Sequence, residues 1–111
     1  MAAASIDRSV FSELQQRTGA DFVGELVEAF GEEGPELLAE LRAALADRAS
    51  DRFRRAAHSL KTNALTFGAR TLAEQARALE LSGLPADGSG VEAVAPELER
   101  SLAELRELAR G

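Results

Sequence analysis

The feature that most restricts the fold of this 111-residue chain is its high content of alanine and leucine. These two residue types fill 38 positions, whereas valine, isoleucine and threonine together fill 10. Alanine and leucine favour helices, and β-branched residues favour strands. A chain of this length forms one domain with a core of its own. We therefore expect a single all-α domain over residues 1–111, with residues 1–5 disordered.

Apolar residues repeat at helical spacing in five segments, which predicts five helices. These helices cover about residues 7–17, 21–47, 51–67, 70–82 and 91–110. Gly19, Gly68 and Gly83 stand where a glycine typically ends a helix. Residues 83–90 form the one clear loop, and Pro96 either opens or kinks the last helix. Short links between long amphipathic helices favour an antiparallel four-helix bundle with a short extra N-terminal helix.

The second predicted helix contains Gly34 and Pro35, which normally interrupt helices. Its apolar residues keep the same phase on both sides, which favours one kinked helix over two. The expected buried stripe is Phe22, Leu26, Phe30, Leu37, Leu41 and Leu45. Asp21 is the expected N-cap of this helix, and Ser50 or Asp51 is that of the next.

The composition argues against several classes of protein. The absence of cysteine excludes disulfides, thiolate metal sites and cysteine nucleophiles. A net charge of −6 argues against binding to nucleic acid or to a membrane surface. No apolar run is long enough to span a membrane and no signal peptide is present, so we expect a cytoplasmic protein. One histidine and scattered carboxylates make a metal site unlikely to form, and we expect no metal and no cofactor.

The only histidine, His58, and the only lysine, Lys61, lie three residues apart in a basic segment. Residues 48–70 carry six basic side chains against one acidic side chain. At about 100° per residue, the apolar residues of this helix fall within roughly 40° of Phe53, whereas His58 falls at about 140°. The stripe expected in the core is Phe53, Ala57, Leu60, Ala64 and Phe67. The helical phase therefore places His58 in solvent, with the apolar Leu65 exposed beside it.

Two interpretations of this exposed histidine follow from the residues alone. An exposed histidine on a basic helix is usually just a solvated side chain. In that case the basic face of residues 52–65 indicates a helical adaptor that binds a partner without phosphorylation. Alternatively, a neutral imidazole can accept a phosphoryl group, and Lys61 can neutralise the added charge. Leu65 then belongs to a docking surface. A DNA-binding bundle is disfavoured by the acidic balance.

The residues around His58 match a known pattern. The run Ala57-His58-Ser59-Leu60-Lys61 is followed by Gly68-Ala69, by Leu72 and by Leu79-Glu80. This pattern resembles the histidine phosphotransfer (HPt) domain of two-component phosphorelays, which usually reads A-H-x-L-K-G with a later glycine and L-E. Thr62 stands where the family usually has glycine, which we expect to narrow the choice of partners. Asn63 stands where serine is common and can make similar hydrogen bonds.

The resemblance implies a function. His58 would take a phosphoryl group, at Nε2, from the aspartyl phosphate of one receiver domain and pass it to another. The expected partners are response-regulator receiver domains and a histidine kinase or hybrid kinase. Such a domain has no ATP-dependent kinase activity of its own, and no Gly-rich phosphate-binding motif is visible here. Mg²⁺ would be needed only in the receiver, and a monomer is expected rather than a dimer.

The resemblance also implies roles for neighbouring residues. Lys61 would stabilise the phosphate, and Arg54 and Arg55 are weaker candidates for that role. Glu80 would either hydrogen-bond the imidazole and fix its tautomer, or be a solvated side chain near the end of its helix. Gly68 would have a structural role at the end of the histidine helix. The residues expected to contact partners are Arg54, Arg55, Thr62 and Leu65.

Overall fold

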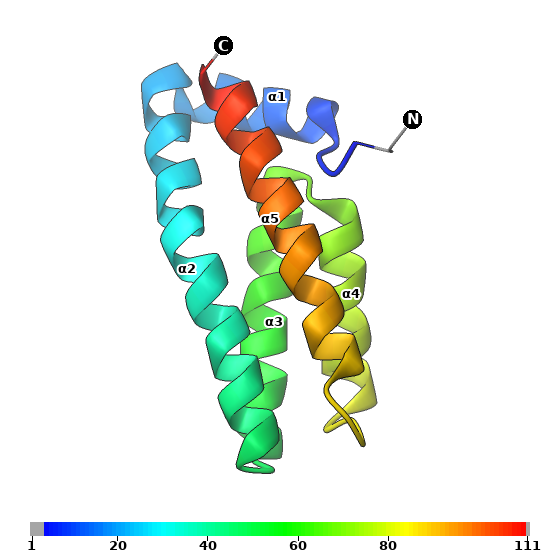
Figure 1. Cartoon of the computed structure of the whole chain (residues 1–111). Helices are drawn as coiled ribbons and strands as arrows, with labels where there is room; N and C mark the ends of the chain where they lie inside the picture. Colours follow the sequence, from blue (N-terminus) through cyan, green and yellow to red (C-terminus); the bar gives the residue numbers. More distant parts are fainter. Residues whose placement is uncertain (1–3, 111) are drawn as a thin grey trace.

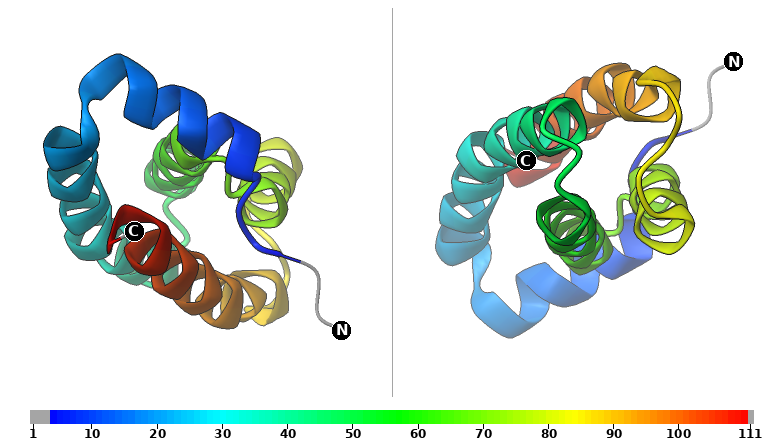
Figure 2. Two further views of the ribbon diagram at one scale, coloured as in Figure 1. Left: turned by 90° about the horizontal axis from the view of Figure 1, so that it is seen from above. Right: turned by 90° about the horizontal axis from the view of Figure 1, so that it is seen from below.

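A computed structural model describes residues 4–110, which contain five α-helices and no strand (Figure 1). The helices are α1 (Arg8–Thr18), α2 (Ala20–Ala46), α3 (Ser50–Phe67), α4 (Arg70–Ser82) and α5 (Ser89–Arg110). The prediction of an all-α fold is therefore confirmed. The four longer helices lie side by side, and α1 lies across the end of the bundle where α5 finishes (Figure 2). No helix in these residues is both long and apolar enough to cross a membrane.

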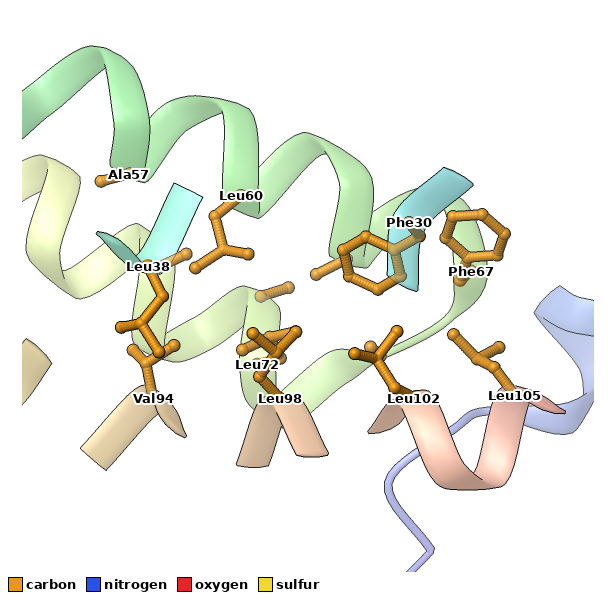
Figure 3. Close-up of a cluster of buried hydrophobic side chains, with 14 of the residues drawn as sticks. Phe30, Leu38, Ala57, Leu60, Phe67, Leu72, Val94, Leu98, Leu102 and Leu105 are labelled. Carbon is orange, nitrogen blue, oxygen red and sulfur yellow. The ribbon is translucent and has the colours of Figure 1, made fainter. Parts of the chain in front are cut away.

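The core lies between α2, α3, α4 and α5, whose apolar side chains point toward one another (Figure 3). The rings of Phe30 and Phe67 are stacked, with their centroids 5.1 Å apart. The stripe predicted for α3 is buried in full, together with Ala56. Because this stripe faces the core, the opposite face of α3 is left to solvent, and His58 lies on that face.

Helix α2 is a single helix that contains Pro35, as predicted, but of its predicted stripe only Phe30 and Leu41 are fully buried. Phe22 is 49% exposed, and Leu26, Leu37 and Leu45 are only partly buried. The buried stripe is Val23, Val27, Phe30, Gly34, Leu38, Leu41 and Ala44. This stripe passes through a glycine, so an apolar pattern does not reveal it. Helix α5 approaches closely there, since a Cβ on Gly34 would lie 3.0 Å from Leu98.

The predicted N-caps of α2 and α3 were also wrong. Asp21 and Asp51 lie in the first turns of these helices, and Ser50 is already helical. Each helix follows a sharp turn with a positive φ, at Gly19 (91°) and at Arg48 (53°). Because the chain reverses within these turns, the helix resumes before the acidic residue. Both carboxylates still face the positive end of the helix dipole.

The start of α5 and the N-terminal residues of the chain differ in detail from the prediction. Helix α5 begins at Ser89 rather than at residue 91, and Pro96 lies inside it. The backbone N–H of Ser5, which is buried, donates to the Glu104 carboxylate over 2.9 Å. Disorder of residues 1–5 stays a prediction, and residues 1–3 lie outside the described part of the chain.

Gly68 ends α3, as predicted, and also joins α1 to the bundle. Its φ of 80° lies in the left-handed region, which glycine adopts without strain. The N–H of Asp7 donates to the Gly68 carbonyl over 2.8 Å. A Cβ at Gly68 would lie 2.8 Å from the Asp7 carbonyl oxygen and 2.9 Å from Val10. The turn between α3 and α4 therefore has no space for a side chain.

Candidate functional site

His58 projects from the middle of α3, and 57% of its side chain is exposed. Its Nδ1 lies 2.7 Å from Oε2 of Glu80, which belongs to the neighbouring helix α4. An ionised carboxylate can only accept a hydrogen bond, so the contact favours the tautomer that carries the proton on Nδ1. In that tautomer Nε2 holds a lone pair and faces away from the carboxylate.

Lys61 contacts the same carboxylate. Its Nζ lies 2.6 Å from Oε1 of Glu80, so each oxygen of Glu80 has its own basic partner. The side chain of Glu80 is 16% exposed and that of Lys61 is 23% exposed. Hydrogen bonds from Lys61 first, and then from His58, hold the pKa of Glu80 below its usual range. Glu80 is therefore negatively charged at neutral pH and links α3 to α4.

The basic segment is less cationic in the folded protein than its composition suggests. Of its six basic residues, four are paired with carboxylates. These pairs are Arg52 with Glu40 and Asp47, Arg54 with Asp51, Lys61 with Glu80, and Arg70 with Asp7. Arg48 donates instead to the carbonyl of Pro85 over 3.0 Å. Lys61 is therefore not a free cation in the folded protein, and its partner Glu80 comes from another helix.

The polar residues that follow Lys61 bond to their own helix. The Thr62 hydroxyl donates to the backbone oxygen of His58 over 3.0 Å. The Asn63 amide donates to the carbonyl of Ser59 over 3.0 Å. Thr62 is exposed, so its methyl group and its engaged hydroxyl form the rim beside His58. A molecule that approaches His58 therefore meets the Thr62 side chain beside the imidazole.

A cleft of about 150 Å³ opens between α3 and α4 beside Lys61. Leu65, which is 56% exposed, lines it from α3. The α4 side is formed by Arg70, Ala73, Glu74 and Arg77. Sequence reasoning missed these α4 residues, although their spacing places them on one face of the helix. Arg54, Arg55, Thr62 and Leu65 are all exposed, as expected for residues that contact a partner.

Comparison with known proteins identifies the family. The sequence model described as the Hpt domain matches residues 25–108. The chain belongs to the Hpt domain family. Its structure is similar to that of histidine-containing phosphotransfer protein B (HptB) from Pseudomonas aeruginosa PAO1. That match has a TM-score of 0.77 and 28% sequence identity, and it covers 98% of this chain and 94% of the other. A search of curated proteins returns no significant match.

The Hpt assignment confirms the resemblance seen in the sequence. The chain is a histidine phosphotransfer protein of the kind that works in phosphorelays. Its family implies interaction with receiver domains and kinases of two-component systems. Within residues 4–110, no group of three or more carboxylate or histidine side chains gathers in a way that could hold a metal ion. The oligomeric state and the need for a cofactor stay predictions.

Proposed function

We propose that His58 accepts a phosphoryl group from the aspartyl phosphate of one receiver domain and passes it to a second receiver. The observation that carries this proposal is the exposed imidazole whose Nδ1 contacts Glu80 at 2.7 Å. This arrangement presents Nε2 to solvent with its lone pair available. A histidine that was only a solvated side chain would need no partly buried carboxylate to fix its tautomer.

In the proposed transfer, one bond to phosphorus forms as another breaks. The Nε2 lone pair attacks phosphorus, and the Nε2–P bond forms as the bond from phosphorus to the aspartyl oxygen breaks. The electron pair of the broken bond leaves with the receiver's carboxylate. The imidazole then carries a positive charge, which the Glu80 carboxylate stabilises through Nδ1–H. Transfer to the second receiver is the same step in reverse.

Lys61 and Glu80 act together in this proposal. Lys61 holds Glu80 against Nδ1, because the two contacts of the carboxylate are 2.6 Å and 2.7 Å long. Direct stabilisation of the phosphate by Lys61 stays a prediction, since the contact that Lys61 makes in the structure is with Glu80. Any Mg²⁺ required for the reaction would be bound by the receiver domain, whose acidic site holds the aspartyl phosphate.

The receiver would dock over α3 and α4 around His58. Leu65 supplies an exposed apolar contact, and the cleft beside it extends that surface onto α4. By helical phase, Arg55 and Thr62 border the other side of His58, whereas Arg54 lies on the side of Lys61. The alternative of a purely charge-binding adaptor is less well supported, because most cations of the 52–65 face are already paired with carboxylates.

The experiment is transfer of labelled phosphate from phosphorylated receiver domains to the purified protein. We expect label that is lost in acid and retained in alkali, as for a phosphoramidate. His58→Gln should abolish labelling. Arg110→Gln, which changes an exposed residue at the far end of α5, is the matched control and should label normally. Label on His58→Gln, or no label on the wild-type protein from any receiver or from phosphoramidate, would contradict the proposal.

A further inference from the structure

Arg55 differs from the basic residues that surround it on α3. Arg52, Arg54 and Lys61 each pair with a carboxylate. Arg55 is exposed, and no carboxylate among residues 4–110 forms an ion pair with it. It lies three residues before His58, which is about one turn of the helix. An arginine without a partner therefore stands beside the imidazole.

The contact with Glu80 determines which way Nε2 points. The two ring nitrogens lie on opposite sides of the imidazole, so an Nδ1 that faces α4 directs Nε2 away from α4. Lys61 lies on the α4 side of His58, because it contacts the same carboxylate. By helical phase, Arg55 lies about 60° away from His58 on the opposite side. Arg55 and Lys61 therefore flank His58 one turn before it and one turn after it, and Arg55 is on the side toward which Nε2 points.

The chemistry of the phosphoryl group also favours the side of His58 on which Arg55 lies. A phosphoryl group on Nε2 adds close to two negative charges and three acceptor oxygens. Proximity to the Glu80 carboxylate would be unfavourable, because both groups are negative. Arginine can contact phosphate through two parallel N–H donors. The 2.6 Å contact with Glu80 holds the Lys61 ammonium on the α4 side, and the Thr62 hydroxyl already donates to a backbone oxygen.

We infer that Arg55 is the cation that contacts the phosphoryl group on His58, and that Lys61 is a positioning residue that holds Glu80 against Nδ1. This inference rests on the proposed function, since it requires a phosphoryl group on Nε2. It reverses the order expected from sequence, in which Lys61 stabilised the phosphate and Arg55 was a partner contact and a weaker candidate for that role. The reversal follows from the pairing of Lys61 across two helices.

The test is a ³¹P NMR titration of the phosphorylated protein, made with phosphoramidate so that no receiver is needed. In that reaction the Nε2–P bond forms as the P–N bond of the donor breaks, and the electron pair leaves with ammonia. A nearby cation lowers the pH midpoint of the second phosphoryl ionisation. Arg55→Ala should raise this midpoint by about 0.2 to 0.4, the effect of losing one exposed ion pair at helical spacing. Arg55→Lys should restore part of it, and Arg110→Ala should leave it unchanged.

Lys61→Ala provides the opposite half of the test. It should move the phosphoryl midpoint less than Arg55→Ala does. In the unphosphorylated protein it should change the ¹⁵N shifts of the imidazole, which report the tautomer, whereas Arg55→Ala should not. An equal or larger ³¹P effect of Lys61→Ala, or no effect of Arg55→Ala, would overturn the inference while leaving phosphorylation of His58 intact. Failure of phosphoramidate and receivers to label His58 in the wild-type protein would instead overturn the proposed function and this inference together.

Discussion

The start and the middle of α3 each carry a cluster of charged side chains, but the two clusters have opposite ratios of basic to acidic groups. At the start, one arginine pairs with two carboxylates, because Arg52 contacts both Glu40 and Asp47 at 2.9 Å. In the middle, one carboxylate serves two bases, because Glu80 contacts both His58 and Lys61. The first cluster is exposed throughout, whereas the central carboxylate of the second is mostly covered.

This difference separates a structural cluster from a reactive one. The Arg52 cluster joins α2 to α3 across the turn and satisfies its guanidinium with two acids. The Glu80 cluster joins α3 to α4, but it engages only one nitrogen of the imidazole and leaves Nε2 unused. A site for group transfer needs a nucleophile such as this Nε2, which is held in position and is still open to a partner. The two clusters should therefore respond differently to substitution.

The largest expected effect is on phosphoryl transfer in variants of Glu80. Glu80→Ala removes the acceptor of Nδ1–H, so the wrong tautomer becomes populated and Nε2 loses its lone pair. We expect transfer to fall roughly 10- to 100-fold, as when a group that orients a reactive histidine is lost. Glu80→Gln keeps an acceptor, so its transfer rate should lie between those of Glu80→Ala and the wild-type protein. The measurement is the initial rate of labelling from one phosphorylated receiver.

Glu40→Ala is the matched control for this prediction, because it removes a carboxylate from the other cluster. We expect its labelling rate to remain within about twofold of the wild-type rate, since Glu40 contacts Arg52 and not the imidazole. A similar loss in both variants would show that the two clusters act on transfer through the stability of α3 alone.

The next largest effect concerns the turns that flank α3. Gly68→Ala places a Cβ within 3 Å of the Asp7 carbonyl and of Val10, at a φ of 80°. We expect a loss of about 1–3 kcal/mol in the free energy of unfolding. Denaturation in urea measures it. Gly68→Asn is the companion variant, because asparagine tolerates the left-handed angles of Gly68 (φ 80°, ψ 19°) better than alanine but still carries a Cβ. A full recovery of stability in Gly68→Asn would assign the cost to backbone strain and not to the crowded α1 contact.

A smaller effect is expected from Arg52→Ala. Exposed ion pairs contribute little to stability, so the variant should show only a slight fall in Tm. Its rate of phosphoryl transfer should match that of the wild-type protein. A Tm loss as large as that of Gly68→Ala would show that the start of α3 depends on this cluster more than its exposure indicates.

Sequence patterns predicted the face of α3 that carries His58, because large apolar residues repeat there without interruption. They failed on α2, where the buried stripe passes through Gly34 and leaves Phe22 exposed. The contact between His58 and Glu80 was anticipated only through the family resemblance, since 22 residues and a turn separate the two. The pairing of Arg52 with Glu40 had no local signal at all. Charge counting along a segment cannot identify partners that come from a neighbouring helix.

The smallest expected effect is a difference in how much Glu40 and Glu80 contribute to the stability of the fold as the pH falls. A hydrogen bond from Arg52 lowers the pKa of Glu40, and hydrogen bonds from Lys61 and then His58 lower that of Glu80. An unfolded chain therefore binds more protons than the folded one, so each carboxylate stabilises the fold above its ordinary pKa of 4.5. That contribution is lost as the pH falls through the lower folded value.

Each Glu→Gln variant should therefore show a shallower fall of Tm between about pH 5 and pH 3 than the wild-type protein. Glu80→Gln should flatten the curve more, because solvent screens its ion pairs less at 16% exposure than those of Glu40 at 41%. Above pH 6 the slopes of the wild-type and variant curves should agree, since both carboxylates are ionised in the folded and unfolded chains. A larger flattening in Glu40→Gln would mean that the exposed cluster at the start of α3, and not the covered one at His58, carries more of the stability of the fold in acid.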